Sequence, residues 1–218
     1  MVIIPKIIKI LLKQSCLLCR QSSDDIICEY CSDDLASHLN FNKETLELDC
    51  GEYDYYYLLN YTAEVKYLLK KLKFHKDLLV ESIFDKLISI WWQNSIDKEL
   101  VDIDAIAAVP IHRFRYLYRG FNQAELLANK LSQYTNIPTT FTNYKRVKYT
   151  KPQSKSSKQK RIDQIKGVFK LNKPIQAKHL VVFDDVLTTG STLKEFVQTI
   201  KKGSQIDKIS IITLVRAG

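Results

Sequence analysis

The stretch LVVFDDVLTTGSTL, residues 180–193, constrains the fold of this chain more than any other part of the sequence. Four apolar residues, 180–183, run into two adjacent aspartates, and a Thr-Thr-Gly-Ser-Thr cluster then leads into a helical pattern. Such an apolar run is typical of a central parallel strand that is buried on both faces. Because open α/β sheets bind ligands at the carboxyl ends of their strands, Asp184 and Asp185 are expected to lie at a binding site.

The hydroxyl-rich turn after these aspartates indicates the kind of ligand. Thr188 to Thr192 offer hydroxyl and backbone N–H groups around Gly190, at the start of a predicted helix whose N-terminus favours anions. The carboxylates could accept hydrogen bonds from sugar hydroxyls. The stretch therefore predicts a site for a ribose 5-phosphate unit. The alternative, a strand that ends in acids before an ordinary capped helix, explains each residue separately but not their order.

Four of the five cysteines form a second constrained pattern, C-x2-C-x8-C-x2-C. Two such pairs predict a closed tetrahedral S4 site of the kind that holds structural zinc. Two redox CxxC pairs are the alternative, and iron could occupy the same ligands. The predicted ligands are Cys16, Cys19, Cys28 and Cys31. The fifth, Cys50, is interpreted as a buried small hydrophobe.

The rest of the chain alternates strand and helix patterns. The aromatic run YDYYYLLNY from Tyr53 predicts a strand, although it could also supply aromatics that stack on bases. Helical spacing follows in TAEVKYLLKKLKFHKD and continues to Trp92, and IDAIAAVP predicts a buried strand that ends at Pro110. We expect two domains, a zinc module at residues 1–45 and an α/β domain at residues 46–218.

The chain opens with MVIIPKIIKILLK, which resembles a signal peptide in its apolar content. Lysines interrupt it, so we interpret residues 6–13 as an amphipathic helix. No transmembrane segment is predicted, and the cysteine spacing favours metal in a reducing, cytoplasmic setting over disulfides.

Positive charge is concentrated in the second half of the chain. The formal net charge is +9, and residues 141–178 hold twelve Lys or Arg against one acid, Asp163. This balance indicates an anionic partner. Residues 146–164 lack a hydrophobic period and predict a basic loop, either a plain linker or a lid that closes on phosphates or nucleic acid. Three arginines after Pro110 predict a second anion-binding turn between a strand and a helix.

Taken with these motifs, LVVFDDVLTTGST resembles the phosphoribosyl-pyrophosphate (PRPP) signature of type I phosphoribosyltransferases at all thirteen positions. The chain as a whole resembles the ComF family, the amidophosphoribosyltransferase-like proteins associated with natural competence. The cysteine pairs, KYLLKKLKF, VPIHRFRYLYRGFNQAELLA, RVKYTKPQS, KQKR and KGVF carry this wider resemblance. It implies a type I phosphoribosyltransferase, Rossmann-like α/β fold with a central parallel sheet, preceded by a small four-Cys zinc ribbon.

The resemblance also implies residue roles. Asp184 and Asp185 would be the catalytic pair that contacts the ribose hydroxyls, with Mg²⁺ held through the ligand. The implied PRPP-binding residues are Asp184, Asp185, Val186, Leu187, Thr188, Thr189, Gly190, Ser191 and Thr192. The implied pyrophosphate loop consists of Pro110, Ile111, His112, Arg113, Arg115 and Arg119. The implied lid spans residues 150–161, and the lid and nucleic-acid residues are Arg146, Lys148, Lys151, Lys155, Lys158, Lys160 and Arg161.

Two functions from different classes follow. The first is a cytoplasmic PRPP-binding protein that assists incoming single-stranded DNA in natural competence, using its basic lid and its zinc module. The second is a metabolic phosphoribosyltransferase that transfers ribose 5-phosphate from PRPP to a base or amine and releases pyrophosphate. The zinc module could also dock a protein partner, such as a helicase of the uptake machinery.

Overall fold

A computed structural model describes residues 14–75, 77–94, 100, 102–150 and 165–217 of the chain. The predicted helix at residues 6–13 lies outside this part. The chain divides into two compact units, Met1–Leu39 and Asn40–Gly218.

The N-terminal unit consists of a hairpin and a helix in its described part. Strands β1 (Gln14–Ser15) and β2 (Ser22–Ser23) pair antiparallel, and α2 (Glu29–Ser37) follows. Cys16 and Cys19 lie in the turn of the hairpin, which Arg20 closes in the left-handed region at φ 67°. The second cysteine pair lies at the start of a helix, because Cys28 is the N-cap of α2 and Cys31 lies in its first turn.

A five-stranded mixed sheet forms the centre of the second unit, in the order β3-β4-β9-β8-β5. All neighbouring strands pair in parallel except β3 and β4, so the predicted parallel sheet carries one antiparallel edge strand. The strands are β3 (Glu44–Leu48), β4 (Gly51–Asn60), β5 (Ala105–Ala108), β8 (His179–Leu187) and β9 (Lys208–Arg216). Beside the sheet, β6 (Tyr144–Arg146) and β7 (Phe169–Leu171) form an antiparallel pair after a short 3₁₀ turn, η2 (Phe141–Asn143).

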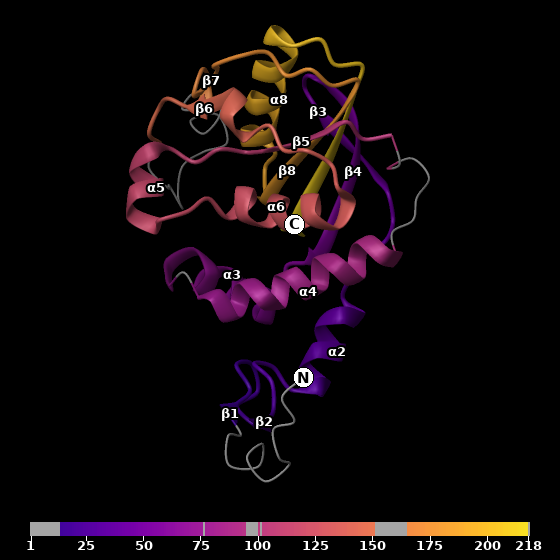
Figure 1. The fold of residues 1–218 in the computed structure, drawn as a ribbon, viewed down its shortest axis with the longest axis vertical. Coiled ribbons are helices and arrows are strands. Elements are labelled where there is room, and N and C mark those ends of the chain that lie inside the picture. Colours follow the sequence, from indigo (N-terminus) through magenta and orange to yellow (C-terminus); the bar gives the residue numbers. More distant parts are fainter. Residues whose placement is uncertain (1–13, 76, 95–99, 101, 151–164, 218) are drawn as a thin grey trace. The chain divides into compact units, whose positions relative to one another are not determined.

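Helices cover both faces of this sheet, as Figure 1 shows for α8 and α6 on opposite sides of β8. Helix α8 buries Leu193, Phe196, Val197 and Ile200 against one face. The helices are α3 (Ala63–His75), α4 (Leu78–Asn94), α5 (Arg113–Arg119), α6 (Gln123–Thr135) and α8 (Ser191–Gly203). Within the described residues, no helix has the length and hydropathy that a membrane crossing would need.

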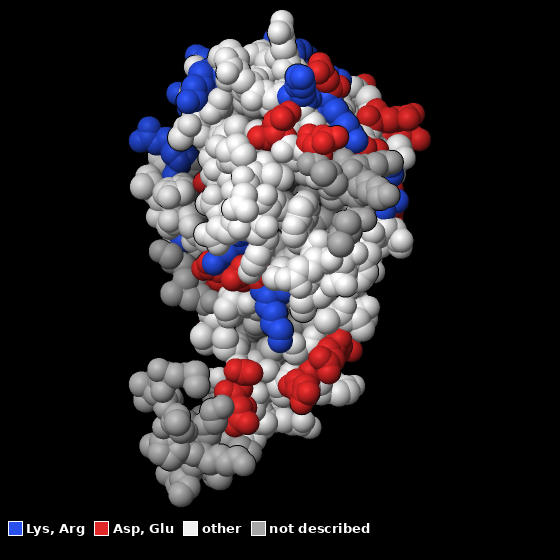
Figure 2. Space-filling model, turned by 45° about the vertical axis from the view of Figure 1, so that its right-hand side comes forward, with Lys and Arg blue, Asp and Glu red and all other residues white. Residues whose placement is uncertain are grey.

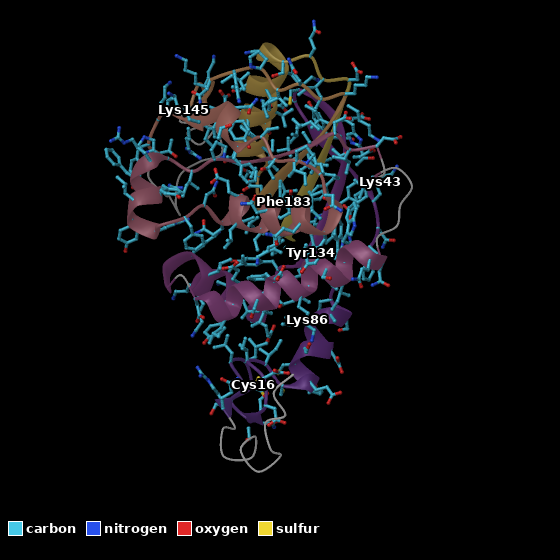
Figure 3. All side chains as sticks on the ribbon, viewed as in Figure 1. Cys16, Lys43, Lys86, Tyr134, Lys145 and Phe183 are labelled. Carbon is cyan, nitrogen blue, oxygen red and sulfur yellow. The ribbon has the colours of Figure 1, made fainter. Side chains whose placement is uncertain are left out.

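Alternation along each inner strand sends side chains to both helical layers, which is why the strands are apolar throughout. Phe183, labelled in Figure 3, is 1% exposed at the middle of β8. The predicted strands from Tyr53 and before Pro110 and the predicted helices to Trp92 are confirmed by β4, β5, α3 and α4. The predicted strand at residues 180–183 is longer than expected, because β8 continues through both aspartates to Leu187 and pairs with β9 along that length.

Candidate functional site

Asp184 and Asp185 lie near the carboxyl end of β8, an inner strand of the sheet. The end of β5 lies beside them, because Ala108 pairs with Phe183 and the Val109 N–H donates to the Phe183 carbonyl at 2.9 Å. The loop that follows β5 therefore begins next to the two aspartates. The two sequence motifs, far apart in the chain, meet at one edge of the sheet.

The turn after β8 brings hydroxyl groups and the start of α8 to the same edge. Gly190 has a φ of 69°, and a Cβ added there would lie 2.9 Å from Leu48 Cδ2. The left-handed backbone conformation therefore favours glycine, and a Cβ would also force the end of the Leu48 side chain to move. Thr189 Oγ1 and Ser191 Oγ lie 2.6 Å apart, and Thr188 and Thr189 are exposed.

Helix α8 begins at Ser191, as the sequence predicts, so Ser191 and Thr192 stand in its first turn. Val186 and Leu187, by contrast, belong to the strand rather than to the turn. Leu187 is buried in the core, and its carbonyl accepts a hydrogen bond from the Ala217 N–H. The hydroxyls and free N–H groups of the turn come from residues 188–192.

Basic groups from three separate segments surround the two carboxylates. Lys73 Nζ of α3 lies 2.6 Å from Asp185 Oδ2, with both side chains largely shielded from solvent. The charge of Arg146, at the end of β6, acts on Asp184, and that of Arg119, at the end of α5, acts on Asp185. The edge of the sheet thus presents acceptors for hydroxyl groups together with cations for phosphates.

Asp184 differs from its neighbour in its ionisation. Burial, reinforced by the negative charge of Asp185, raises the pKa of Asp184 to about 8. The Asp185 N–H donates to Asp184 Oδ1 at 2.9 Å, and the charges of Lys73 and Arg146 partly oppose the rise. Near neutral pH, Asp184 therefore carries a proton in part of the molecules.

The three arginines after Pro110 are in a helix rather than in the predicted turn. His112 caps α5, since its Nδ1 accepts from the Phe114 N–H at 3.2 Å, and Gly120 ends it in the left-handed region. Arg115 and Arg119 are half-buried, whereas Arg113 is exposed with its guanidinium 5.7 Å from the centre of the Phe114 ring. Two of the three arginines therefore face inward.

Arg146 joins this group through the backbone and through Thr150. A parallel bridge pairs His112 with Arg146, and Arg146 Nη2 donates to Thr150 Oγ1 at 2.7 Å. Arg115 Nη2 donates to the Thr150 carbonyl, also at 2.7 Å. Burial, with the nearby charge of Arg115, lowers the pKa of Arg146 to about 10. Thr150 thus accepts a hydrogen bond from each guanidinium and holds the two like charges close together.

The start of α6 supports the loop after β5. Asn122 is buried, and its Nδ2 donates to the Val109 carbonyl at 3.0 Å while its Oδ1 caps the helix at Ala124 N. Gln123 is 1% exposed, and its Oε1 accepts from Arg119 Nη1 at 3.1 Å. Within the described part of the chain, Gln123 Nε2 is buried without a hydrogen-bond partner. Gln123 therefore orients Arg119 and keeps one donor available beside it.

The other predicted lid and nucleic-acid residues fall outside this cluster or outside the described residues. Lys148 Nζ donates to the Lys166 carbonyl at 3.1 Å instead of facing the aspartates. Lys151, Lys155, Lys158, Lys160 and Arg161 lie outside the described residues. Lys145, labelled in Figure 3, is exposed on β6.

The four cysteines of the N-terminal unit come together as the spacing predicts. Their sulfur atoms all lie within 4.8 Å of one another, and Cys19 Sγ and Cys28 Sγ are 3.6 Å apart. A tetrahedral site with metal–sulfur bonds of about 2.3 Å needs sulfurs about 3.8 Å apart, so the four thiols could hold a metal ion.

Thiolate formation is already favoured at one of these sulfurs. Burial opposes ionisation of Cys16, but backbone N–H groups, among them that of Cys28 at 3.3 Å, outweigh it and lower the Cys16 pKa to about 6. Burial raises the pKa of Cys31. A bound cation would be needed to ionise the whole set.

Sequence reasoning missed two residues of the site. Lys73 precedes Asp184 by 111 residues, and the nearby Lys70 and Lys71 cannot be distinguished from it in the sequence. Gln123 reads as an ordinary helix residue. The sequence did contain a signal for Gln123, because a polar residue at the start of a helix, shortly after several arginines, can contribute to an anion-binding site.

Comparisons with known proteins agree with this geometry. A model of the phosphoribosyl transferase domain family matches residues 117–218, which include α6, β8, the turn and α8. The fold and site thus define a phosphoribosyltransferase-like α/β protein, preceded by a unit whose four cysteines could hold a metal.

Curated relatives show to which family of phosphoribosyltransferase-like proteins the chain belongs. Competence protein F of Haemophilus influenzae is 30% identical over 162 residues, 72% of this chain and 70% of that protein. DNA utilization protein YhgH of Escherichia coli K12 is 31% identical over 140 residues, 64% of this chain and 62% of that protein. Competence protein ComFC of Bacillus subtilis is 27% identical over 158 residues, 72% of this chain and 62% of that protein. The chain belongs to the ComF family.

Solved structures overlap less closely. The allosteric regulatory enzyme of purine biosynthesis is 17% identical with a TM-score of 0.38, over 61% of this chain and 26% of that chain. Adenine phosphoribosyltransferase of Leishmania tarentolae is 13% identical with a TM-score of 0.34, over 66% and 73%. At such scores the overlaps carry no weight beside the family match.

Proposed function

We propose that the carboxyl edge of the sheet binds PRPP. The observation that carries the proposal is the meeting of Asp184 and Asp185, the Gly190 turn and the cations Lys73, Arg119 and Arg146 at this edge. Carboxylates suit the ribose hydroxyls, and the turn at the start of α8 suits the 5-phosphate. The cations suit the diphosphate, so each part of PRPP has a matching group.

The proposed roles follow from this match. Thr188, Thr189, Gly190, Ser191 and Thr192 cradle the 5-phosphate with hydroxyl and N–H groups. Arg119 and Arg115, with the start of α6 beside them, receive the diphosphate. When bound, Mg²⁺ would neutralise charge on the diphosphate oxygens. Residues 150–161 remain the proposed lid.

We propose that this PRPP-binding protein acts in natural competence and handles incoming single-stranded DNA in the cytoplasm. The names of the relatives, competence protein and DNA utilization protein, support this role. The charge distribution supports the proposed binding of single-stranded DNA, since Glu125 is the sole acid between Asp104 and Asp163. A cationic stretch of this length suits a phosphate backbone.

We assign the DNA role to the second unit rather than to the cysteine unit. Residues 1–39 contain five acids against four bases, whereas residues 40–218 contain 29 Lys or Arg against 19 acids. The positive charge that attracts a phosphate backbone therefore belongs to the second unit. The four-cysteine site is then a structural zinc site, and the unit around it is a candidate for docking a protein partner such as a helicase.

Fluorescence anisotropy with labelled single-stranded DNA tests the DNA role. Affinity should fall linearly on a log–log plot against salt, with a slope of about −0.7 for each phosphate neutralised. Reversing Lys155, Lys158 and Lys160 to Glu should weaken binding and make that slope shallower. The matched control reverses three exposed lysines elsewhere, Lys66, Lys178 and Lys202, with the same change in net charge. Equal loss in both variants, or no binding by the wild type, would contradict the role.

A metabolic phosphoribosyltransferase is the second candidate, favoured by the family match over residues 117–218. Transfer to a base or amine must release pyrophosphate from PRPP. A panel of bases and amines therefore tests it, with Asp185→Asn as the variant that should abolish release. Pyrophosphate release with none of the acceptors would leave PRPP binding without transfer.

A further inference from the structure

Helix α5 carries an exposed apolar side that the PRPP site does not use. None of its seven residues is buried. Phe114 is 58% exposed, Leu117 72% and Tyr118 82%. Side chains three and four residues apart share one side of a helix, so these three form a stripe. We call this stripe, together with Tyr149, the α5 face.

A short helix with this composition is not held by burial of its own apolar residues. Its ends are fixed instead, by the His112 cap and by Gly120, and its two inward arginines reach Thr150 and Gln123. Figure 1 shows α5 at the margin of the second unit, apart from the sheet. Burial in the core does not explain the aromatic side chains of α5, and exposed apolar groups of this kind often mark a binding surface.

Aromatic contacts extend the α5 face beyond the helix. The Phe114 and Tyr149 ring centres are 6.2 Å apart in an edge-on arrangement, and His112 lies 5.1 Å from Phe114 and 5.5 Å from Tyr149. Arg115 lies 5.8 Å from the centre of the Tyr149 ring. The rings of His112, Phe114 and Tyr149 therefore contact one another at the start of α5.

The charged residues of α5 and of β6 are all cations. Residues 105–124 contain no acid, and Arg113, Arg115 and Arg119 stand among the apolar residues of the helix. On the next strand, Lys145 and Arg146 add two cations. Elsewhere on the surface both signs occur together, since Figure 2 shows Lys and Arg side chains next to Asp and Glu near the top of the view. An apolar stripe framed by cations complements a ligand with flat apolar faces and a polyanionic backbone.

Resting on the proposed DNA role, we propose that the α5 face is a stacking platform for the bases of single-stranded DNA. Phe114, Tyr118 and Tyr149 would receive bases on their rings, while the arginines of the same helix contact the flanking phosphates. Exposed rings beside a cationic path are the general requirement for binding single strands, and such stacking tolerates any base. A single strand is favoured over a protein partner because every charged residue of α5 and β6 is a cation, which suits a ligand that carries a phosphate at each nucleotide.

Anisotropy with the full chain, loaded with zinc, tests the platform. The probes are an oligodeoxythymidine and an abasic strand of equal length and charge. The variants are Tyr118→Ala, which removes a side chain that is 82% exposed, and Phe114→Ala with Tyr118→Ala. The control is Tyr61→Ala, a tyrosine that is 45% exposed elsewhere in the second unit.

Wild type should prefer the oligodeoxythymidine over the abasic strand, and the double variant should lose about fivefold or more of its affinity for the former alone. Tyr61→Ala should behave as wild type. Wild-type affinity in the double variant would overturn the platform, keep the DNA role, and leave the α5 face to a protein partner. Failure of the wild type to bind either strand would overturn the DNA role and, with it, the platform.

Discussion

Lys73 Nζ and Asp185 Oδ2 lie 2.6 Å apart, which ties helix α3 to the carboxyl end of β8. Asp185 shares a largely shielded site with Asp184, where two carboxylates repel each other. The positive charge of Lys73 reduces this repulsion. Lys73 also brings a cation to within reach of a bound diphosphate. The pair is therefore both a support of the free site and a part of the proposed binding surface.

Replacing Lys73 with Met should weaken binding of PRPP with Mg²⁺ by about tenfold, since one unpaired carboxylate and one missing cation act in the same direction. The matched control is Lys71→Met on the same helix, because Lys71 Nζ lies 3.5 Å from Asp77 rather than at the site. Calorimetric titration of both variants measures the difference. Equal affinities would show that Lys73 has no part in the site.

The Gly190 turn should not accept a side chain. Gly190→Ala places a Cβ in the left-handed region, at a cost of about 1–2 kcal/mol, and 2.9 Å from Leu48 Cδ2. Gly167→Ala is the control, because its φ is 66° but its Cβ would meet only the end of Lys148, at 3.3 Å. Urea denaturation should rank Gly190→Ala as the less stable variant.

A double variant separates the two causes at Gly190. Adding Leu48→Ala to Gly190→Ala removes the close contact but keeps the strained backbone. The double variant should therefore be more stable than the sum of the two single changes predicts. Simple additivity would mean that contact with Leu48 is not what requires glycine.

Asp184 should make stability depend on pH. Its folded pKa of about 8 lies above the ordinary value of 3.8, so the folded protein binds more protons than the unfolded chain between these values. Stability contributed by this group is present below pH 3.8 and is lost as pH rises toward 8. Asp184→Asn keeps an acceptor for the Asp185 N–H and removes the titration.

Urea denaturation at several pH values measures this effect. The free energy of unfolding of Asp184→Asn, relative to wild type, should grow between pH 5 and 8 by about 1 kcal/mol or more. A constant difference across that range would mean that Asp184 ionises normally in the folded protein.

The cysteine unit should hold one metal ion, which we expect to be zinc. Cys31→Ser should remove the metal and increase amide hydrogen exchange in α2, because metal binding and folding are coupled in small four-cysteine units. Cys50→Ser is the matched control, since Cys50 is outside the cluster. Elemental analysis with hydrogen exchange measures both effects. Metal retained in Cys31→Ser would exclude the four-sulfur site.

Local sequence patterns predicted most elements of the second unit. Apolar runs and helical spacing located β4, β5, β8, α3, α4 and α8, because these segments bury their side chains in regular patterns. The length of β8 was underestimated, since pairing with β9 carries the strand through two polar residues that look like its end. The predicted turn at Arg113 is a helix, because its caps, His112 and Gly120, are not apolar signals.

The site was predicted only where one segment contains it. Asp184, Asp185 and the Gly190 turn are contiguous, so a sugar-phosphate site could be predicted for them from the sequence. Lys73, Arg146 and Gln123 reach the same edge through the topology of the sheet and its helices, which no local pattern encodes. Arg146, predicted as a lid and nucleic-acid residue, is the last residue of β6, and its charge acts on Asp184.

Calorimetric titration of PRPP with Mg²⁺ into the wild type and into the Asp184→Asn, Asp185→Asn double variant tests the central claim most directly. Both substitutions preserve side-chain size, and urea denaturation of the double variant verifies that it is folded. We predict saturable binding by the wild type and its loss in the double variant. No binding by folded, metal-loaded wild type, or equal binding by the double variant, would contradict the proposed PRPP site.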